Sequence, residues 1–222
     1  MASEKTSKTR ETAAVAEQRV AKTKSTFREY VEAIGMALLL ALFIRTFIVQ
    51  AFKIPSGSMI PTLAIGDHIL VNKLTYGVRI PFWEDYLIEF QKPDRGDVIV
   101  FIFPEDRSKD FIKRVVAVGG DTVEIRQKKV YINGKPATDP HAYFKDGDFA
   151  GEIQPGQNNF GPRTVPDSHL FVMGDNRDSS HDSRFWGYVN LDDVRGKAFL
   201  IYWSWDGTDR WVRWERLGSL IR

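Results

Sequence analysis

The sequence predicts a mainly β protein, with a coiled or barrel-like antiparallel β domain behind one N-terminal transmembrane helix. One apolar run of membrane length ends near Val49. After it come short alternating or continuously apolar segments separated by turn residues, and no long amphipathic helix is indicated beyond residue 50. The 222 residues suffice for one globular domain plus an appended segment.

We expect three parts: a basic cytoplasmic leader over residues 1–30, a transmembrane anchor over 31–50, and an extracytoplasmic β domain over 51–222. Residues 1–28 hold seven basic and three acidic side chains, a net charge of +4, which leaves −2 for the remainder. Positive residues that flank a span mark its cytoplasmic side. The chain is therefore predicted to cross the membrane once, with its N-terminus inside.

The apolar run within the predicted anchor extends from Ala33 to Val49, and the only charge in it is that of Arg45. These residues number about 17, the lower limit for a spanning helix. The long stem of Arg45 can carry its charge to the headgroups. The alternatives are a core helix or a cleaved signal peptide that ends at Val49-Gln50-Ala51. Cleavage there would leave Arg45 inside the apolar region close to the cut, which argues against it.

Period-two alternation and short apolar runs predict the strands of the β domain. The turn pair Asn133-Gly134 follows one of these runs directly, which is a strong hairpin signal. Residues 136–166 are rich in Gly, Pro, Asp and Asn and are expected to form an irregular insertion. The predicted strands are residues 67–74, 98–103, 111–118, 122–126, 130–132, 169–173 and 196–203.

The composition of the chain excludes several kinds of functional site. The chain has no cysteine, so a disulfide framework, a thiolate nucleophile and a zinc knuckle are excluded. The segment from Gly174 to Arg184 is dense in short oxygen acceptors, but Arg177 stands where a calcium loop needs a ligand. No metal or cofactor is predicted. The basic leader directly precedes an apolar run, so its expected partner is the lipid bilayer and not nucleic acid.

Ser58 is a candidate nucleophile. It lies nine residues after Val49, between Pro55 and Pro61, and follows Gly57. The prolines restrict the backbone, and the glycine permits a tight turn and close approach of a substrate. A serine hydroxyl is a weak nucleophile until a base takes its proton. The alternative is an ordinary loop between two prolines.

Lys113 is the candidate base, because it lies in the otherwise apolar run from Phe111 to Val118. A free lysine has a pKa near 10.4, and burial lowers the pKa because it disfavours the ammonium. Periodicity does not distinguish Lys113 from Arg114, but an arginine does not deprotonate in proteins. The alternatives are a lysine that reaches solvent at a strand edge, or a triad that uses His181 as the base.

Taken together, these segments resemble bacterial signal peptidase I, the leader peptidase that removes signal peptides from exported proteins. The resemblance extends from the anchor to the aromatic C-terminal strand, and the first and last of four blocks are highly specific. The blocks, in order, are Pro55 to Leu63, Arg95 to Phe101, Lys113 to Val116, and Gly174 to Gly187.

The resemblance implies a role for each matching residue. Ser58 would be the nucleophile and Lys113 the general base. Ser56 would lend its hydroxyl, beside the Ser58 N–H, to an oxyanion hole, and Ser180 would orient the lysine amine. Arg114, Asp182 and Arg184 would be structural ion-pair residues near the site. Shallow apolar pockets for small substrate side chains would be lined by Phe52, Ile54, Pro55, Met59, Leu63, Ile69, Phe111 and Ile112.

On this interpretation the chain is a membrane-bound serine endopeptidase of the bacterial inner membrane that cleaves signal peptides from preproteins. Two other classes remain open from the sequence. A self-cleaving regulator can use a similar Ser-Lys pair on a similar β domain, although it would need a DNA-binding module where this chain has an apolar run. A membrane-anchored β binding module without catalysis would tolerate replacement of Ser58 and Lys113.

Overall fold

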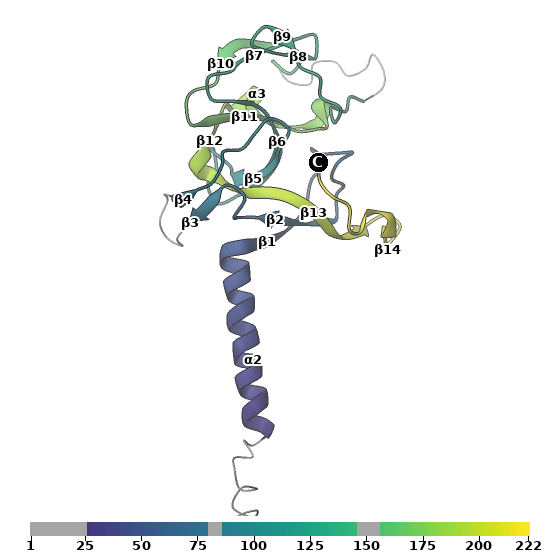
Figure 1. Ribbon diagram of the computed structural model, residues 1–222. Helices are drawn as coiled ribbons and strands as arrows, with labels where there is room; N and C mark the ends of the chain where they lie inside the picture. Colours follow the sequence, from purple (N-terminus) through teal and green to yellow (C-terminus); the bar gives the residue numbers. More distant parts are fainter. Residues whose placement is uncertain (1–25, 80–85, 146–155) are drawn as a thin grey trace, which may run out of the picture. The chain divides into compact units, whose positions relative to one another are not determined.

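The computed structural model describes residues 26–79, 86–145 and 156–222, and the chain divides into two compact units, residues 1–44 and 45–222. The first unit holds helix α2 (Thr26–Phe43), and the second holds the strands (Figure 1). The predicted leader over residues 1–30 lies almost wholly outside the described residues.

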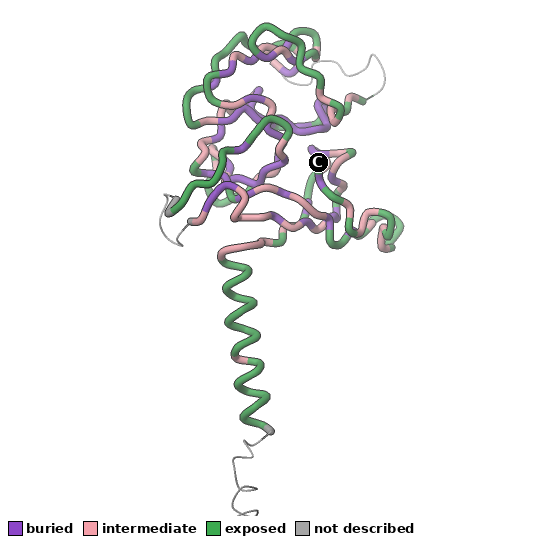
Figure 2. The backbone as a smooth tube through the Cα atoms, viewed as in Figure 1, coloured by how far each residue is buried: buried purple, intermediate pink, exposed green. Residues whose placement is uncertain are grey.

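The helix that carries the apolar run begins before the predicted anchor. Helix α2 continues into a π-helical turn, η1 (Ile44–Ile48), and residues 27–48 are long and apolar enough to cross a membrane. No side chain in this stretch is buried (Figure 2). The helix begins before the predicted residue 31 because polar residues also support it, with Arg28 donating to Glu32 one turn away.

The C-terminal end of the predicted anchor differs from the expectation. Val49 and Gln50 belong to strand β1 (Val49–Lys53), where they pair with Asn72 and Val71. Pairing with the neighbouring strand therefore replaces the helix from Val49 onward.

An eight-stranded sheet forms the larger part of the second unit, in the order β1-β2-β13-β5-β6-β11-β12 with β14 paired to β13. Every named strand pair is antiparallel, and the mainly β prediction is confirmed. Besides β1, the strands of the eight-stranded sheet are β2 (Asp67–Asn72), β5 (Val98–Ile102), β6 (Asp110–Val118), β11 (His169–Met173), β12 (Val189–Asn190), β13 (Val194–Asp206) and β14 (Trp211–Val212).

A four-stranded sheet in the order β10-β7-β8-β9 lies at the end of this unit opposite β1 and β2 (Figure 1). The remaining two named strands, β3 and β4, form a two-stranded sheet. The bounds are β3 (Gly77–Arg79), β4 (Tyr86–Glu89), β7 (Thr122–Arg126), β8 (Lys129–Ile132), β9 (Lys135–Pro136) and β10 (Phe160–Thr164). The helical segments are single turns: η2 (Arg177–Ser179), α3 (Ser183–Trp186), η3 (Leu191–Asp193) and η4 (Trp214–Arg216).

The hairpin predicted from Asn133-Gly134 is present. Both residues have positive φ, 53° and 74°, as a two-residue hairpin turn requires, and β8 continues directly into β9. The predicted insertion over 136–166 is only partly irregular. Residues 160–164 form β10, an edge strand paired with β7, and residues 146–155 lie outside the described residues. The sequence does not predict β10 because Gly161 and Pro162 are typical of turns. The strand can still form because both residue types are tolerated at sheet edges.

Three clusters of buried apolar side chains form the core, and β6 contributes to all of them. Ile112 packs against the first cluster, Val115 belongs to the second and Ala117 to the third. The strand that carries Lys113 is therefore central, with β5 on one side and β11 on the other.

Candidate active site

Ser58 lies in the loop that joins β1 to β2, residues 54–66, which we call the serine loop. Ser58 is nearly buried. The Ile54 N–H donates to Asp67 O and the Leu63 N–H donates to Met59 O, each at 2.8 Å. These bonds fasten the loop on both sides of the serine. The loop therefore holds the hydroxyl in place, as the prolines around it predict.

A second loop holds Ser58 from the other side. The Asn176 N–H donates to Ser58 O, and the Asn176 side-chain amide donates to Gly57 O, both at 3.1 Å. The two loops meet at Gly174, where an added Cβ would lie 2.4 Å from Ser58 O and 2.3 Å from Ser180 Oγ. Only glycine allows this approach.

Lys113 of β6 reaches the serine. Its Nζ lies 2.9 Å from Ser58 Oγ and also donates to Ile112 O at 2.9 Å. The lysine is 4% exposed, and the Phe111 ring lies 5.4 Å from Nζ. A nucleophile and a candidate base are thus within hydrogen-bond reach of each other, although 55 residues separate them in sequence.

Burial is the main influence on the protonation of this lysine. It lowers the pKa of Lys113 from 10.5 to about 8, although the negative charges of Asp182 and Asp175 favour the ammonium. The neutral amine, which can accept a proton from Ser58, is therefore available at mildly alkaline pH.

The structure places the two other predicted serines differently. Ser180 is buried beside Gly174, yet its hydroxyl has no hydrogen-bond partner among the described residues, so the predicted bond to Lys113 is not formed here. Ser56 is exposed on the same loop as Ser58. An oxyanion role for Ser56 and an orienting role for Ser180 remain predictions.

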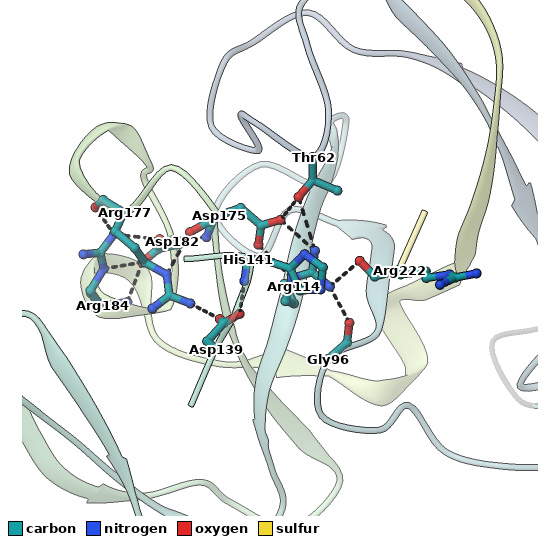
Figure 3. A network of polar contacts seen from close by, with 11 residues as sticks. Thr62, Gly96, Arg114, Asp139, His141, Asp175, Arg177, Asp182, Arg184 and Arg222 are labelled. Carbon is teal, nitrogen blue, oxygen red and sulfur yellow. Dashed lines mark hydrogen bonds and ion pairs between the residues drawn. The ribbon is translucent and has the colours of Figure 1, made fainter. Parts of the chain in front are cut away.

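Arg114, the neighbour of Lys113, forms a buried ion pair with Asp175 (Figure 3). Its Nε and Nη2 donate to the two carboxylate oxygens at 2.8 and 2.7 Å. Thr62, from the serine loop, donates to the same carboxylate at 2.5 Å. The pair therefore links the base strand β6 to the loop of the nucleophile. Two main-chain oxygens, those of Gly96 and Arg222, accept from Arg114 Nη1.

A second buried ion pair joins Arg184 to Asp182, with Nε donating to Oδ1 at 2.8 Å. Asp182 also accepts from the Gly174 N–H at 3.1 Å. Arg184 donates to Arg177 O at 2.8 Å. These contacts fold the loop after β11 onto itself and fix the backbone that faces Ser58. Arg114, Asp182 and Arg184 thus each take part in a buried ion pair, and their structural role in the site remains a prediction.

Sequence reasoning missed Asp175, Asn176 and Thr62 as individual contributors. The signal for Asp175 was available, because a buried arginine requires a carboxylate partner and Arg114 lies in an apolar run. Asn176 and Thr62 have no such signal, since their contacts depend on how two loops distant in sequence meet.

The residues predicted to line substrate pockets mostly form packed core next to Ser58. Four of them are at most 2% exposed and belong to the first core cluster, namely Ile54, Met59, Leu63 and Ile69. Phe52 and Ile112 pack against that cluster, Phe111 packs against the second and stacks on Phe103, and Pro55 is exposed. Their role in lining substrate pockets remains a prediction.

The alternative base, His181, is not in contact with the serine. Its ring stacks on Phe185, and its Nε2 lies 3.9 Å from Glu105. No contact joins it to Ser58 within the described part of the chain. Across residues 26–79, 86–145 and 156–222, no group of three or more His, Asp or Glu side chains gathers in a way that could hold a metal ion.

Comparison with known proteins shows the family of this chain. The signal peptidase I of Pseudomonas fluorescens is 40% identical over 206 residues, which cover 80% of this chain and 72% of the relative. The signal peptidase I of Pseudomonas aeruginosa is 37% identical, with the same coverage. A solved signal peptidase I from Enterococcus faecalis is 31% identical and superposes with a TM-score of 0.39, covering 49% of this chain and 98% of the other. Residues 27–203 match the family described as signal peptidase, peptidase S26, and the chain belongs to that family.

Proposed function

We propose that this protein is a membrane-anchored serine endopeptidase that removes N-terminal signal peptides from exported preproteins, with Ser58 as nucleophile and Lys113 as general base. The single observation that carries the proposal is the 2.9 Å approach of a buried lysine amine to the serine hydroxyl. The names of the relatives supply the substrate class, and the apolar helix over residues 27–48 supplies the anchor.

The reaction follows from these positions. The neutral Lys113 amine accepts the Ser58 proton while Oγ attacks the scissile carbonyl carbon, and a tetrahedral intermediate forms. When the intermediate collapses, the C–N bond breaks and the lysine returns the proton to the leaving amine. A water molecule then attacks the acyl-enzyme ester, with the same lysine as base, and releases the signal peptide carboxylate and free Ser58.

The negative oxygen of the intermediate needs hydrogen-bond donors. The Ser58 N–H makes no hydrogen bond within the described part of the chain, which leaves it free for this role. Ser56, two residues earlier on the exposed side of the loop, supplies the second donor.

The anchor places the reaction at a membrane surface. The basic leader holds residues 1–30 in the cytoplasm, and the β domain lies outside the bacterial inner membrane. Ser58 lies nine positions after Val49, a stretch that spans at most about 30 Å when extended. The nucleophile therefore stays close to the bilayer, where the cleavage region of an exported preprotein emerges.

Cleavage of a preprotein by the purified full chain tests the proposal directly. Wild-type protein should release the signal peptide, whereas Ser58→Ala and Lys113→Arg should be inactive with unchanged circular dichroism. The arginine variant retains the positive charge but does not deprotonate. Activity in Lys113→Arg would remove the lysine as base. Intact protein should also resist alkaline carbonate extraction and keep its own N-terminus, and a mature N-terminus at Phe52 would contradict the uncleaved anchor.

A further inference from the structure

The last two described residues, Ile221 and Arg222, are held against the catalytic side of the β domain. The Ile221 side chain is buried in the first core cluster, which also contains Ile54 and Met59 from the serine loop. The Ile221 N–H donates to Phe199 O of β13 at 3.0 Å. These contacts fix the position of the residue that follows.

Arg222 contributes a main-chain oxygen to the guanidinium of Arg114. That guanidinium is only 2% exposed, so each of its N–H groups needs an acceptor. Asp175 accepts from Nε and Nη2, and Nη1 donates to Gly96 O at 2.7 Å and to Arg222 O at 2.9 Å. Figure 3 shows the two main-chain oxygens on the side of Arg114 away from Asp175. Loss of the Arg222 oxygen would leave one buried N–H without a partner.

We propose that the Ile221–Arg222 segment is a positioning element for the Ser58–Lys113 pair and acts through the main-chain oxygen of Arg222 on Arg114 and Asp175. The segment lies beyond residues 27–203, the part of the chain that matches the peptidase family. The inference rests on the proposed function of the pair.

The path from this segment to the reacting atoms is short. Arg114 is adjacent to Lys113 in β6, so a shift of its guanidinium strains the strand that carries the base. Asp175 also accepts from Thr62 of the serine loop, so the same shift loosens the loop of the nucleophile. Both members of the pair therefore depend on where Arg114 is held.

The electrostatic consequence has a defined sign. Two carboxylates act on the Lys113 amine, those of Asp175 and Asp182, and both favour the ammonium. Each is offset by an arginine, Arg114 for Asp175 and Arg184 for Asp182. If Arg114 is held less firmly, Asp175 is less well neutralised, and the ammonium of Lys113 is stabilised. The rate should then need a higher pH.

The experiment compares the full chain with a chain shortened by Arg222 alone and with Ile221→Ala, which keeps Arg222 but weakens its anchor. Leu220→Ala is the matched control, because that side chain is 63% exposed. For each protein, kcat/KM on a preprotein substrate is measured from pH 6 to 10.5, together with the thermal midpoint. Ser58→Ala is assayed beside them.

We expect the shortened chain to lose about tenfold in kcat/KM at pH 7, the effect of one hydrogen bond to a charged group. The rising limb of its pH-rate profile should move to higher pH, so that part of the loss is recovered near pH 10. Ile221→Ala should change in the same direction, and Leu220→Ala should match the wild type. An unchanged rate and limb in the shortened chain would overturn the inference. So would a lower rate with an unmoved limb, which indicates a structural role only. Undiminished cleavage by Ser58→Ala would refute the proposed function itself, and this inference with it.

Discussion

Replacement of Lys113 by Met should abolish cleavage and yet stabilise the fold at neutral pH. Burial lowers the pKa of Lys113 from 10.5 to about 8, which corresponds to about 3 kcal/mol against the ammonium in the folded state. Methionine is apolar, unbranched and of similar length, so it can fill the same space without the charge. It loses the contacts of Nζ with Ser58 Oγ and Ile112 O, each of which contributes about 1 kcal/mol. A net gain of about 1 kcal/mol should remain at pH 7.

The gain in stability of Lys113→Met over the wild type must depend on pH. Between pH 8 and 10.5 the unfolded chain holds a proton on Lys113 that the folded protein has released, so the free energy of unfolding of the wild type rises with pH. Below pH 8 both states are protonated and the penalty is constant. Above 10.5 neither state is protonated and the penalty is gone. The advantage of Lys113→Met should therefore disappear as the pH rises through this window and become a loss.

The rate of cleavage should depend on the protonation of the same lysine, Lys113. At pH 7 about one lysine in ten is neutral for a pKa of 8, against about one in three thousand for a pKa of 10.5, a difference of about 300-fold. The wild-type kcat/KM should rise about tenfold per pH unit up to pH 8 and then level off. The measurements are kcat/KM from pH 6 to 10.5 and urea unfolding of both proteins at several pH values across this range. A limb near pH 6.5 that His181→Gln abolishes, or a stability gain of Lys113→Met that does not change with pH, would refute the reasoning.

Four further predictions concern the residues around the pair. Ser56→Ala should lower kcat about 10²–10³-fold, the loss typical of one oxyanion donor. Ser180→Ala should lower kcat by about one to three orders of magnitude, because its hydroxyl would orient the lysine amine. Wild-type kinetics in either variant would rule out the corresponding role. Gly174→Ala should lower kcat/KM with little loss of secondary structure, because its Cβ meets two atoms of the site within 2.4 Å, and full activity would contradict the close approach. Asp175→Asn should lower the free energy of unfolding by about 3–5 kcal/mol, since it leaves Arg114 buried without its counter-charge; urea unfolding measures the loss, and a change below about 1 kcal/mol would contradict it.

Much of this molecule can be derived from local pattern. The apolar run predicts the helix, and Asn133-Gly134 predicts a hairpin. Alternation predicts the strand from 122 to 126, and a short apolar run predicts the strand from 169 to 173, both with their observed bounds. These signals are local because a helix period, a strand period or a positive φ is set by residues that are neighbours in the chain. Ser58 and Lys113 are also predicted from sequence, through chemistry and the combined resemblance of four segments.

The tertiary structure decided what depends on contacts between distant residues. Strand β10 forms in spite of Gly161-Pro162 because β7 offers it an edge. The 2.9 Å approach of Lys113 to Ser58 depends on the placement of β6 beside the serine loop. The support of Arg114 by Asp175 and Arg222, across 61 and 108 residues, has no period in the sequence. Such contacts arise only when the sheet brings separate segments together, because a buried guanidinium takes whichever acceptors the fold places around it.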